Sequence, residues 1–528
     1  MVEFKLNFID ISIIIIYFLF IFYRGFLYYK SHSDAEEYFL AGRKLTWPLI
    51  GLSLYASNMS SSSLVGMAAS GYETGFSVFS YEWMAAVVLI IFAIFFLPFY
   101  LSSGVYTMPE FLERRYSKKI RYYFSALTII GNIGIDTAAT LYAGALVIKI
   151  VFPGIELWES ILVLAIVSGL YTIAGGLTAV VYTDSIQAVL LIIGSVIITV
   201  NVFSKIGSWD AVTAILPPDH FRIFQPADDR FLPWPGVFTG VLLLGFYFWG
   251  TNQFIVQRAL GAKNIRHGQW GSLFAGFLKV STPLFLMILP GAMARVLYPD
   301  LENANLVYPT LLFDLLPVGL LGLVLAGLIA AMMSSIDSAL NSASTLVTMD
   351  FIRVLKPGIS SEGLMWAGRI VTFIFMVLSA LWAPQIDKFP TLWDYLQNAL
   401  SFISPPIVAL FVTGVFWKRA NSKGALVSIV AGIFCSLIFL FYSDSGFLSE
   451  IHYLYFAAIL FLICTLTIVI VSLFTDEPPE EKYEGLTWDI SIFHKESAEL
   501  EKIPITGNYR YQAIALLLFT ALILTLFG

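Results

Sequence analysis

The chain has 528 residues, of which 58% are hydrophobic and only 12% are charged, and its mean hydropathy is +0.81. A soluble protein carries roughly twice this charged fraction, so the composition excludes an ordinary soluble domain. The formal net charge of −6 is small for the length and argues against a nucleic-acid partner.

The apolar residues gather in runs of about 20, the length at which a helix crosses a lipid bilayer. Spanning segments in lipid are helices or closed barrels, and barrel strands alternate apolar and polar residues. Runs such as 11–22 and 191–202 show no alternation. The sequence therefore predicts an all-α polytopic membrane protein surrounded by the lipid bilayer. We expect about 14 transmembrane helices, near residues 8–28, 47–74, 80–104, 120–152, 158–180, 182–205, 236–261, 268–298, 308–350, 363–384, 393–417, 422–441, 451–474 and 510–527.

The orientation follows from lysines and arginines, which gather in alternate loops, such as the loop with Arg114, Arg115, Lys118 and Lys119. Basic loops face the cytoplasm. Both termini are therefore expected outside it, and the acidic loop at about 475–509 inside. We expect the plasma membrane, or the cell inner membrane if the protein is bacterial. The first run has no small-residue cleavage site after it, so we expect a helix there rather than a signal peptide.

Two predicted spans have polar interruptions. The segment 58–63 contains an asparagine and four serines, and Gly245 and Gly250 bracket aromatic residues just before Asn252. Serines can also bond back to their own helix, so an unbroken, packed helix is the alternative for the first segment. Discontinuous helices at matching places in two halves indicate an inverted-repeat transporter with its site at the membrane midplane.

Ionisable residues at membrane depth are costly and usually functional. Four are predicted there: Glu82, Asp184, Lys279 and Asp337. The alternatives are an interfacial position for Glu82, a helix N-cap for Asp184 and a structural ion pair for Lys279. Gln397 is a weaker candidate, because it could simply join two helices by a hydrogen bond.

The ninth span presents Ala331, Ser334, Ser335 and Ser338 on one helical face. Small residues on one face also suit close helix packing. A hard cation such as sodium prefers several oxygen ligands with little steric bulk. Two hydroxyls, together with carbonyls freed by a broken partner helix, meet that need without a carboxylate.

With these features the sequence resembles the sodium:solute symporter family, in particular its sodium/glucose (galactose) cotransporter branch. The resemblance runs from about Glu37 to Gly432. The blocks that carry it are Tyr38–Arg43, Thr107–Leu112, Gly175–Asp184, Asn252–Arg258, Asn341–Asp350 and Gly414–Ala425.

The resemblance implies a LeuT-type 5+5 inverted-repeat core at residues 47–417, which works by alternating access driven by sodium. Residues 1–46 then form an extra helix and a cytoplasmic loop, and residues 418–528 contribute three peripheral helices. It also implies that one sodium binds the carbonyls of Ala56, Met59 and Ala331 and the hydroxyls of Ser334 and Ser335.

The sugar-binding branch implies a substrate site at Asn58, Ser63, Glu82, Phe248, Trp249, Lys279 and Gln397. A sugar offers a ring of hydroxyls, to which Glu accepts, Lys donates, and Asn and Gln do both. Three positions depart from the branch: Ser63 replaces a His or Gln, Phe248 a Tyr, and Gly245 an Asn or Thr. These departures leave a polyol or inositol open as the solute.

In some members a second sodium binds at an Asp and hydroxyls, which match Asp184 and Ser338, whereas Asp337 stands where Ser or Thr is expected. The second sodium is a hypothesis. We expect a non-enzymatic, sodium-coupled importer of a hexose such as glucose or galactose. The alternatives are a polyol, sialic acid or proline symporter, and, in a different class, a membrane solute sensor or channel. The sequence leaves the oligomeric state open.

Overall fold

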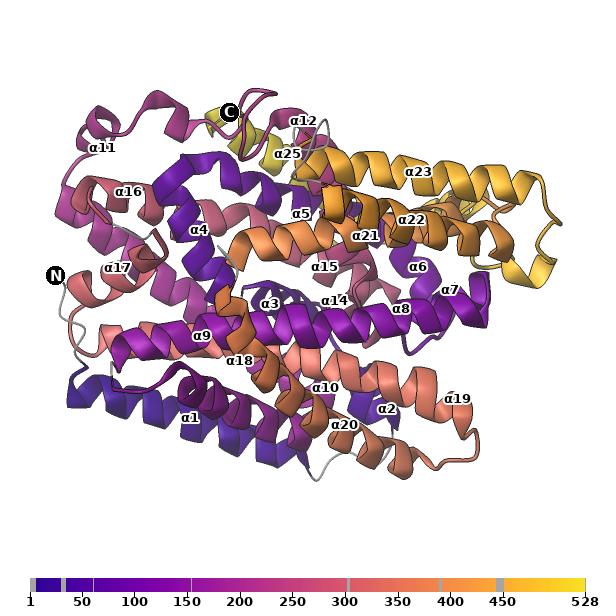
Figure 1. Cartoon of the computed structure of the whole chain (residues 1–528), viewed down its shortest axis with the longest axis horizontal. Helices are drawn as coiled ribbons and strands as arrows, with labels where there is room; N and C mark the ends of the chain where they lie inside the picture. The colour runs from indigo at the N-terminus through magenta and orange to yellow at the C-terminus, as the bar shows by residue number, and fades with distance from the viewer. Residues whose placement is uncertain are drawn as a thin grey trace.

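The structure is a computed structural model of the chain, and it describes residues 6–29, 35–59, 61–152, 154–301, 304–388, 392–442 and 451–527. These residues form a helical bundle without a β-sheet, in which most long helices run along the horizontal axis of Figure 1. Eight helical stretches in the described ranges are long and apolar enough to cross a membrane.

The first part of the chain contains α1 (Phe8–Tyr29), α2 (Ala35–Leu40), α3 (Trp47–Asn58), α4 (Ser61–Thr74), α5 (Phe79–Ile91), α6 (Leu97–Ser102), α7 (Met108–Arg115), α8 (Lys118–Ile130) and α9 (Ala138–Val151). The middle part contains α10 (Leu157–Ile206), α11 (Trp209–Ile215), α12 (Trp234–Gly236), α13 (Leu242–Phe246), α14 (Gln253–Leu260), α15 (Ile265–Ser281), α16 (Leu289–Leu297), α17 (Val307–Leu315) and α18 (Leu320–Leu346). The last part contains α19 (Arg353–Leu355), α20 (Ser361–Trp382), α21 (Leu392–Phe416), α22 (Ser422–Tyr442), α23 (Tyr453–Leu473), α24 (Ile490–Leu500) and α25 (Tyr509–Phe527).

Short helical turns of two kinds connect these helices. Wide, π-helical turns are η3 (Phe92–Phe96), η4 (Gly131–Thr137), η6 (Val237–Val241), η7 (Tyr247–Thr251), η8 (Leu284–Ile288) and η10 (Val347–Ile352). Tight, 3₁₀ turns are η1 (Ala41–Arg43), η2 (Gly75–Val78), η5 (Pro218–Phe221), η9 (Ala304–Leu306), η11 (Ala383–Lys388), η13 (Glu480–Lys482) and η14 (Ile505–Gly507). Wide turns of this kind often mark functional sites in helical proteins.

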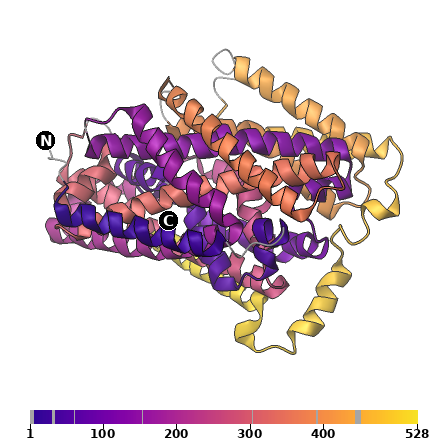
Figure 2. The same cartoon turned by 90° about the horizontal axis from the view of Figure 1, so that it is seen from below.

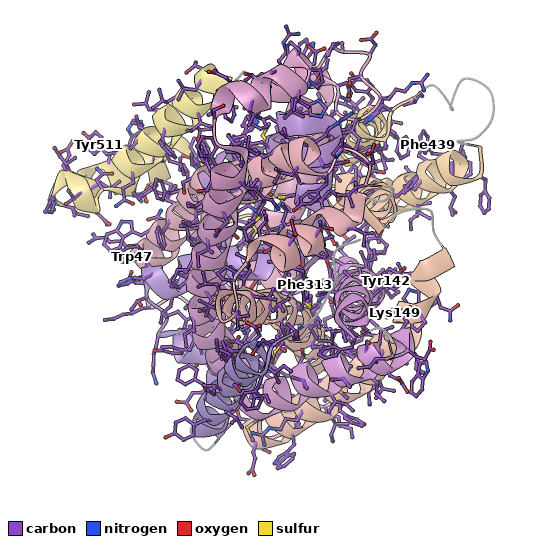
Figure 3. The ribbon with its side chains drawn as sticks, turned by 90° about the vertical axis from the view of Figure 1, so that its left-hand side faces the viewer. Trp47, Tyr142, Lys149, Phe313, Phe439 and Tyr511 are labelled. Carbon is purple, nitrogen blue, oxygen red and sulfur yellow. The ribbon has the colours of Figure 1, made fainter. Side chains whose placement is uncertain are left out.

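The distribution of side chains is that of a membrane protein. Large apolar side chains cover the outside, among them Leu518 at 67% exposure and Phe434 at 63%, and Figure 3 shows Trp47 and Tyr511 at one outer edge of the bundle. Charged side chains such as Lys279 lie fully buried. In a membrane, lipid tails contact such a surface, so the exposed apolar side chains lie against other apolar groups rather than against water.

The predicted span 308–350 is wrong as a single helix. The chain leaves α17 at Leu315 and starts α18 at Leu320, because Pro317 cannot donate a backbone hydrogen bond and Gly319 adopts a φ of +89°. The buried Asp10 of α1 then caps α18, and its Oδ1 accepts from the backbone N–H groups of Gly319 at 2.7 Å and Gly322 at 2.8 Å.

The predicted spans 158–180 and 182–205 correspond to one helical element, the 50-residue α10. A straight helix of this length would measure about 75 Å, more than twice the thickness of the hydrocarbon core. However, the neighbours α9 and α11 both lie toward the left-hand side of Figure 1, so α10 leaves and returns to the same side. Such a course accommodates two crossings within one element.

Helices α4 and α16 pack against each other through reciprocal glycines. A Cβ atom on Gly71 of α4 would collide with the carbonyl of Ile288, and one on Gly291 of α16 would collide with the carbonyl of Ala68. Small residues at such crossings allow the backbones of membrane helices to approach closely.

Of the helices beyond residue 417, α23 packs into the core, where Leu454, Leu460 and Cys464 are fully buried. Figure 2 shows α22 along one side of the molecule and α24 at the opposite side. The acidic segment at about 475–509, predicted as a loop, contains the short helix α24, whose N-cap is Asp489.

Candidate functional site

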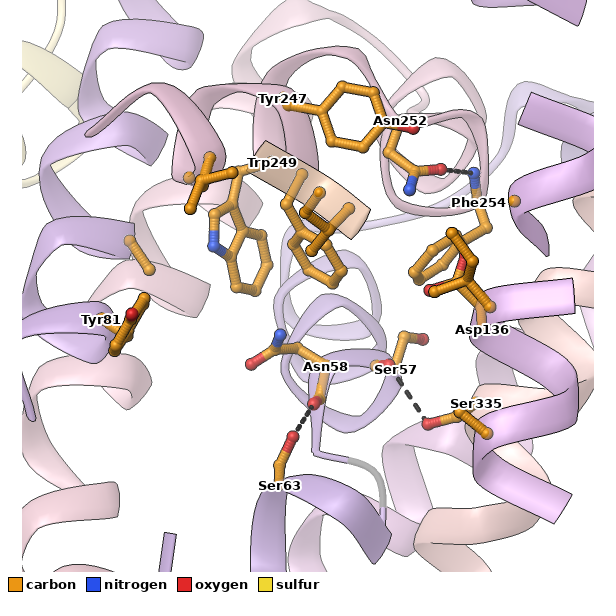
Figure 4. A pocket seen from close by; sticks show the side chains of 18 of the residues that line it. Ser57, Asn58, Ser63, Tyr81, Asp136, Tyr247, Trp249, Asn252, Phe254 and Ser335 are labelled. Atoms are coloured by element: carbon orange, nitrogen blue, oxygen red, sulfur yellow. Dashed lines mark hydrogen bonds between the residues drawn. The ribbon is translucent and has the colours of Figure 1, made fainter. Parts of the chain in front are cut away.

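The first interruption lies between α3 and α4. Helix α3 ends at Asn58, Met59 leaves the helical region with φ −83° and ψ 69°, and α4 begins at Ser61. The Ser63 hydroxyl donates to the backbone carbonyl of Asn58 at 2.9 Å (Figure 4). Since serine and asparagine offer the backbone such local partners, the polar run ends the helix as predicted.

The second interruption lies between η7 and α14. Asn252 adopts an extended conformation, with φ −68° and ψ 127°, and its side chain accepts from the Phe254 N–H at 3.3 Å, which caps α14. Both interruptions predicted from the sequence are therefore present in the backbone.

A cavity of about 180 Å³ lies where these two interruptions meet. Pockets for drug-sized ligands measure roughly 300–1,000 Å³, so this cavity suits a small solute. Its lining comes from both broken helices and from their neighbours, and Figure 4 shows many of these side chains converging on one space. The lining includes Ser57, Asn58, Ser63, Tyr81, Glu82, Asp136, Tyr247, Phe248, Trp249, Asn252, Phe254, Lys279 and Ser335.

Lys279 of α15 organises the polar side of the cavity. Its ammonium forms an ion pair with the Glu82 carboxylate of α5 and donates to the side-chain carbonyl of Asn58. Lys279 is 0% exposed and Glu82 is 3% exposed. Glu82 is therefore buried inside the bundle, and the ion pair considered for Lys279 is present at the cavity wall.

Aromatic rings form the facing side. The Trp249 ring centroid lies 5.8 Å from the Lys279 ammonium, and Phe248 packs edge-on against Trp249 with centroids 5.2 Å apart. Phe254 meets Phe248 in the same way at 5.4 Å. The cavity thus combines hydrogen-bonding groups with an aromatic face.

Several cavity residues were missed by the sequence analysis, among them Asp136 and Tyr247. Asp136 projects from the wide turn η4, and Tyr247 lies in η7. Asp136 sits in the middle of the predicted span 120–152, so the argument that singled out Glu82 and Lys279 applies equally to it. Tyr247 gave no comparable signal, because aromatic residues are common in membrane helices.

The structure describes some of the candidate sodium ligands. The Ser335 hydroxyl of α18 donates to the backbone carbonyl of Ser57 at 3.3 Å (Figure 4), which brings α18 against the end of α3. The carbonyl of Ala56 accepts from the Met59 N–H at 3.1 Å at this end. The side chains of Ala331, Ser334 and Gln397 lie outside the described residues, although all three belong to helices α18 and α21. The sodium ligand set stays a prediction.

Asp184 and Ser338, the candidates for a second sodium, lie in one buried cluster with an unexpected member, Arg258 of α14. The Arg258 guanidinium pairs with the Asp184 carboxylate at 3.1 Å and donates to the Ser338 hydroxyl. Asp184 lies inside the helical element α10, and its carboxylate accepts from the side chains of Ser53, Ser57 and Arg258. Asp337 is fully buried on α18 beside Ser338.

Two interrupted helices around a central cavity, inside a bundle with a lipid-compatible surface, define a polytopic membrane transporter of the inverted-repeat type. The sequence model of the sodium:solute symporter family matches residues 38–432. The chain belongs to this family.

Relatives and solved structures agree with that assignment. The chain is 37% identical to "Sodium/glucose cotransporter 4" of Danio rerio, over 94% of this chain and 84% of that protein. It is 35% identical to "Sodium/myo-inositol cotransporter" of Canis lupus familiaris, over 91% of this chain and 75% of that protein. A solved structure of a Na⁺-coupled sialic acid symporter aligns with a TM-score of 0.80 at 24% identity, covering 89% of this chain and 99% of that one. The fold is therefore the LeuT-type core that the resemblance implied.

Proposed function

We propose that the protein is a sodium-coupled symporter that imports a hexose across the plasma membrane by alternating access. The observation that carries the proposal is the Lys279–Glu82–Asn58 group, which lines a cavity of about 180 Å³ together with the Trp249 ring. Such a group offers charged and amide hydrogen bonds to hydroxyls, while an aromatic face covers the C–H surface of a sugar ring.

The charges of the cavity favour a neutral solute over an anion. Among the lining residues that the structure describes, Lys279 is the one cationic group and is already paired with Glu82, and Asp136 adds a second carboxylate. A carboxylate-bearing solute such as sialic acid would meet like charge without an unpaired cation to bind it. Among organic solutes, the cavity therefore fits a polyhydroxylated neutral molecule best.

A polyol such as myo-inositol is the second candidate. Ser63, Phe248 and Gly245 offer fewer hydrogen bonds than the residues expected of the sugar branch, and all three line the cavity. A relative named as a sodium/myo-inositol cotransporter lends this candidate further support.

We propose that the driving sodium binds where α18 meets the end of α3. The ligands are the carbonyls of Ala56, Met59 and Ala331 and the hydroxyls of Ser334 and Ser335. The Ser335–Ser57 hydrogen bond supports this assignment, because it brings one of these hydroxyls to a helix end with freed carbonyls.

Uptake into proteoliposomes tests the proposal. Purified protein receives an inward sodium gradient and radiolabelled glucose, galactose or myo-inositol, with unlabelled proline and sialic acid as competitors. We expect saturable accumulation of a hexose above its external concentration, and no accumulation when potassium replaces sodium or when an ionophore collapses the gradient. Preference for myo-inositol would select the second candidate. Flux that never exceeds equilibration would contradict the symporter and favour a channel or a sensor.

The topology proposal places both termini outside the cytoplasm. It rests on the basic loops, among them the one that begins after α7. Single cysteines introduced near each terminus should react with an impermeant maleimide in intact cells. Labelling only after the membrane is opened would reverse the orientation.

A further inference from the structure

The cavity contains a carboxylate without a partner, that of Asp136 in the wide turn η4. Figure 4 shows this side chain beside Phe254, among the residues that line the cavity. The carboxylate forms no hydrogen bond or ion pair with any residue that the structure describes. The backbone carbonyl of Asp136 accepts from the Thr140 hydroxyl at 2.8 Å, but the side chain does not take part. Since polar groups inside proteins nearly always have a partner, this absence calls for an explanation.

Other carboxylates inside the bundle show what Asp136 lacks. Asp10 accepts from two backbone N–H groups of α18, Glu82 pairs with an ammonium group, and Asp350 pairs with a guanidinium group. Removing a carboxylate from water without such compensation is costly. We therefore expect the partner of Asp136 to come from outside the chain.

The turn that carries Asp136 is held in place by two helices. The Asn132 side chain donates to the Ser342 hydroxyl of α18 at 2.9 Å, and the Ser379 hydroxyl of α20 donates to the Ile133 carbonyl at 3.2 Å. Because these contacts fix the backbone of η4, the carboxylate is positioned at the cavity before a solute binds. Such preorganisation is the condition for a selective binding site.

Asp136 and the Lys279–Glu82 pair lie on different sides of the cavity. In Figure 4, Asp136 is at one edge of the space and Tyr81 is at the opposite edge. Tyr81 precedes Glu82 on α5, and both residues line the cavity. A solute that contacts the Lys279–Glu82 pair with one part therefore meets Asp136 with another part.

We propose that Asp136 forms a second polar subsite, which binds two adjacent hydroxyls of the solute. The two oxygens of a carboxylate accept hydrogen bonds and can take two in parallel. Neighbouring hydroxyls of a sugar or cyclitol ring are paired donors of this kind. The inference rests on the proposed function and deepens it, because it restricts the solutes to those with a pair of adjacent hydroxyls at this end. A solute that lacks one of the two leaves the carboxylate incompletely paired, so the subsite discriminates against it.

Competition by monodeoxy solutes tests the subsite. Wild type, Asp136→Ala and Asp136→Asn take up radiolabelled glucose, galactose or myo-inositol, whichever the wild type accumulates, in sodium-energised proteoliposomes. Each monodeoxy form of that solute serves as a competitor. In the wild type, the deoxy forms at two neighbouring carbons should inhibit about 10- to 150-fold more weakly than the parent solute. In Asp136→Ala these two penalties should disappear while those at the other carbons remain. In Asp136→Asn, which keeps one acceptor oxygen, they should shrink.

Thr137→Val serves as the matched control. Thr137 is the next residue of the same turn, but it is not among the residues that line the cavity. Its hydroxyl is buried and has no hydrogen-bond partner in the part of the chain that the structure describes. Valine has the same shape, so this variant should keep the wild-type order of inhibition.

Melting temperatures separate solute binding from folding. Since Asp136→Asn removes an unpaired charge, it should melt no lower than the wild type without solute. Saturating solute should raise its melting temperature less than that of the wild type, because the variant binds more weakly. A clearly lower melting temperature of Asp136→Asn without solute would reveal a structural role and overturn the subsite.

The remaining outcomes distinguish this inference from the proposed function. An Asp136→Ala variant with the wild-type pattern of inhibition would overturn the subsite and leave sodium-coupled uptake intact. Stronger inhibition by an amino sugar than by the parent sugar, lost in Asp136→Asn, would also overturn it, because the partner would then be an ammonium group. A wild type without any sodium-driven uptake would instead refute the proposed function.

Discussion

Replacing either member of the Lys279–Glu82 pair should destabilise the protein strongly. Both side chains are buried, so Lys279→Gln leaves an unpaired carboxylate in the core, and Glu82→Gln leaves an unpaired ammonium. Breaking a buried ion pair from one side costs about 3–5 kcal/mol. The double variant removes both charges and should recover much of this loss.

A double-mutant cycle measures the effect. The free energy of unfolding is obtained for the wild type, both single variants and the double variant by chemical denaturation in mixed micelles. We expect each single variant to unfold at a clearly lower denaturant concentration than the double variant. Single variants as stable as the wild type would refute the view that the pair is buried and coupled.

Transport by the double variant then reports on substrate binding rather than folding. A hydrogen bond from a charged group contributes about 1.5–3 kcal/mol, which corresponds to a rise in KM of about 10- to 150-fold. If the refolded double variant keeps the wild-type KM for the hexose, Lys279 and Glu82 do not bind the solute.

Three further changes address the sodium site, the aromatic face and the loop that contains His220. Ser335→Ala should raise the sodium concentration for half-maximal uptake by about two- to tenfold, and Ser342→Ala on the same helix, whose hydroxyl accepts from Asn132 at 2.9 Å, should leave it unchanged. Trp249→Ala should raise the solute KM by about tenfold because it removes the ring's contact with the solute, and it should also lower the melting temperature, since Trp249 is 3% exposed and packs on Phe248. Burial lowers the pKa of His220, whose ring lies 3.1 Å from the Arg295 guanidinium, so the folded loop favours the neutral ring. The neutral His220 ring therefore contributes its full stability above about pH 6.5, and this contribution declines as the pH falls. Between pH 7 and pH 5, the melting temperature of His220→Gln should drop less than that of the wild type. An equal drop in both proteins would contradict the assignment.

The sequence predicted the fold where local composition decides the structure. Apolar runs marked the helices, and the polar segments around Asn58 and Asn252 marked both interruptions, because side chains that bond their own backbone end helices wherever they cluster. The split between α17 and α18 was missed, although Pro317 and Gly319 signal it. The sequence pattern predicts a single helix over residues 308–350 instead.

The site was less predictable because its contacts join distant segments. Glu82 and Lys279 were singled out separately, by their depth in the membrane, but only the packing of α5 on α15 makes them partners. Asp136 satisfied the same criterion and was overlooked. Arg258 lies near the end of a short helix, where a basic residue usually faces the membrane surface, so its burial against Asp184 depends on tertiary structure alone.

The reciprocal glycines of α4 and α16 set the distance between these two helices. Since neither Gly71 nor Gly291 leaves room for a Cβ atom, the two backbones lie in direct contact where these helices cross. We therefore expect α4, the second half of the first interrupted helix, to move together with α16. Spin labels placed on these two helices should keep a constant distance from each other throughout the transport cycle. A helix whose distance from this pair changes during the cycle then belongs to the moving part of the transporter.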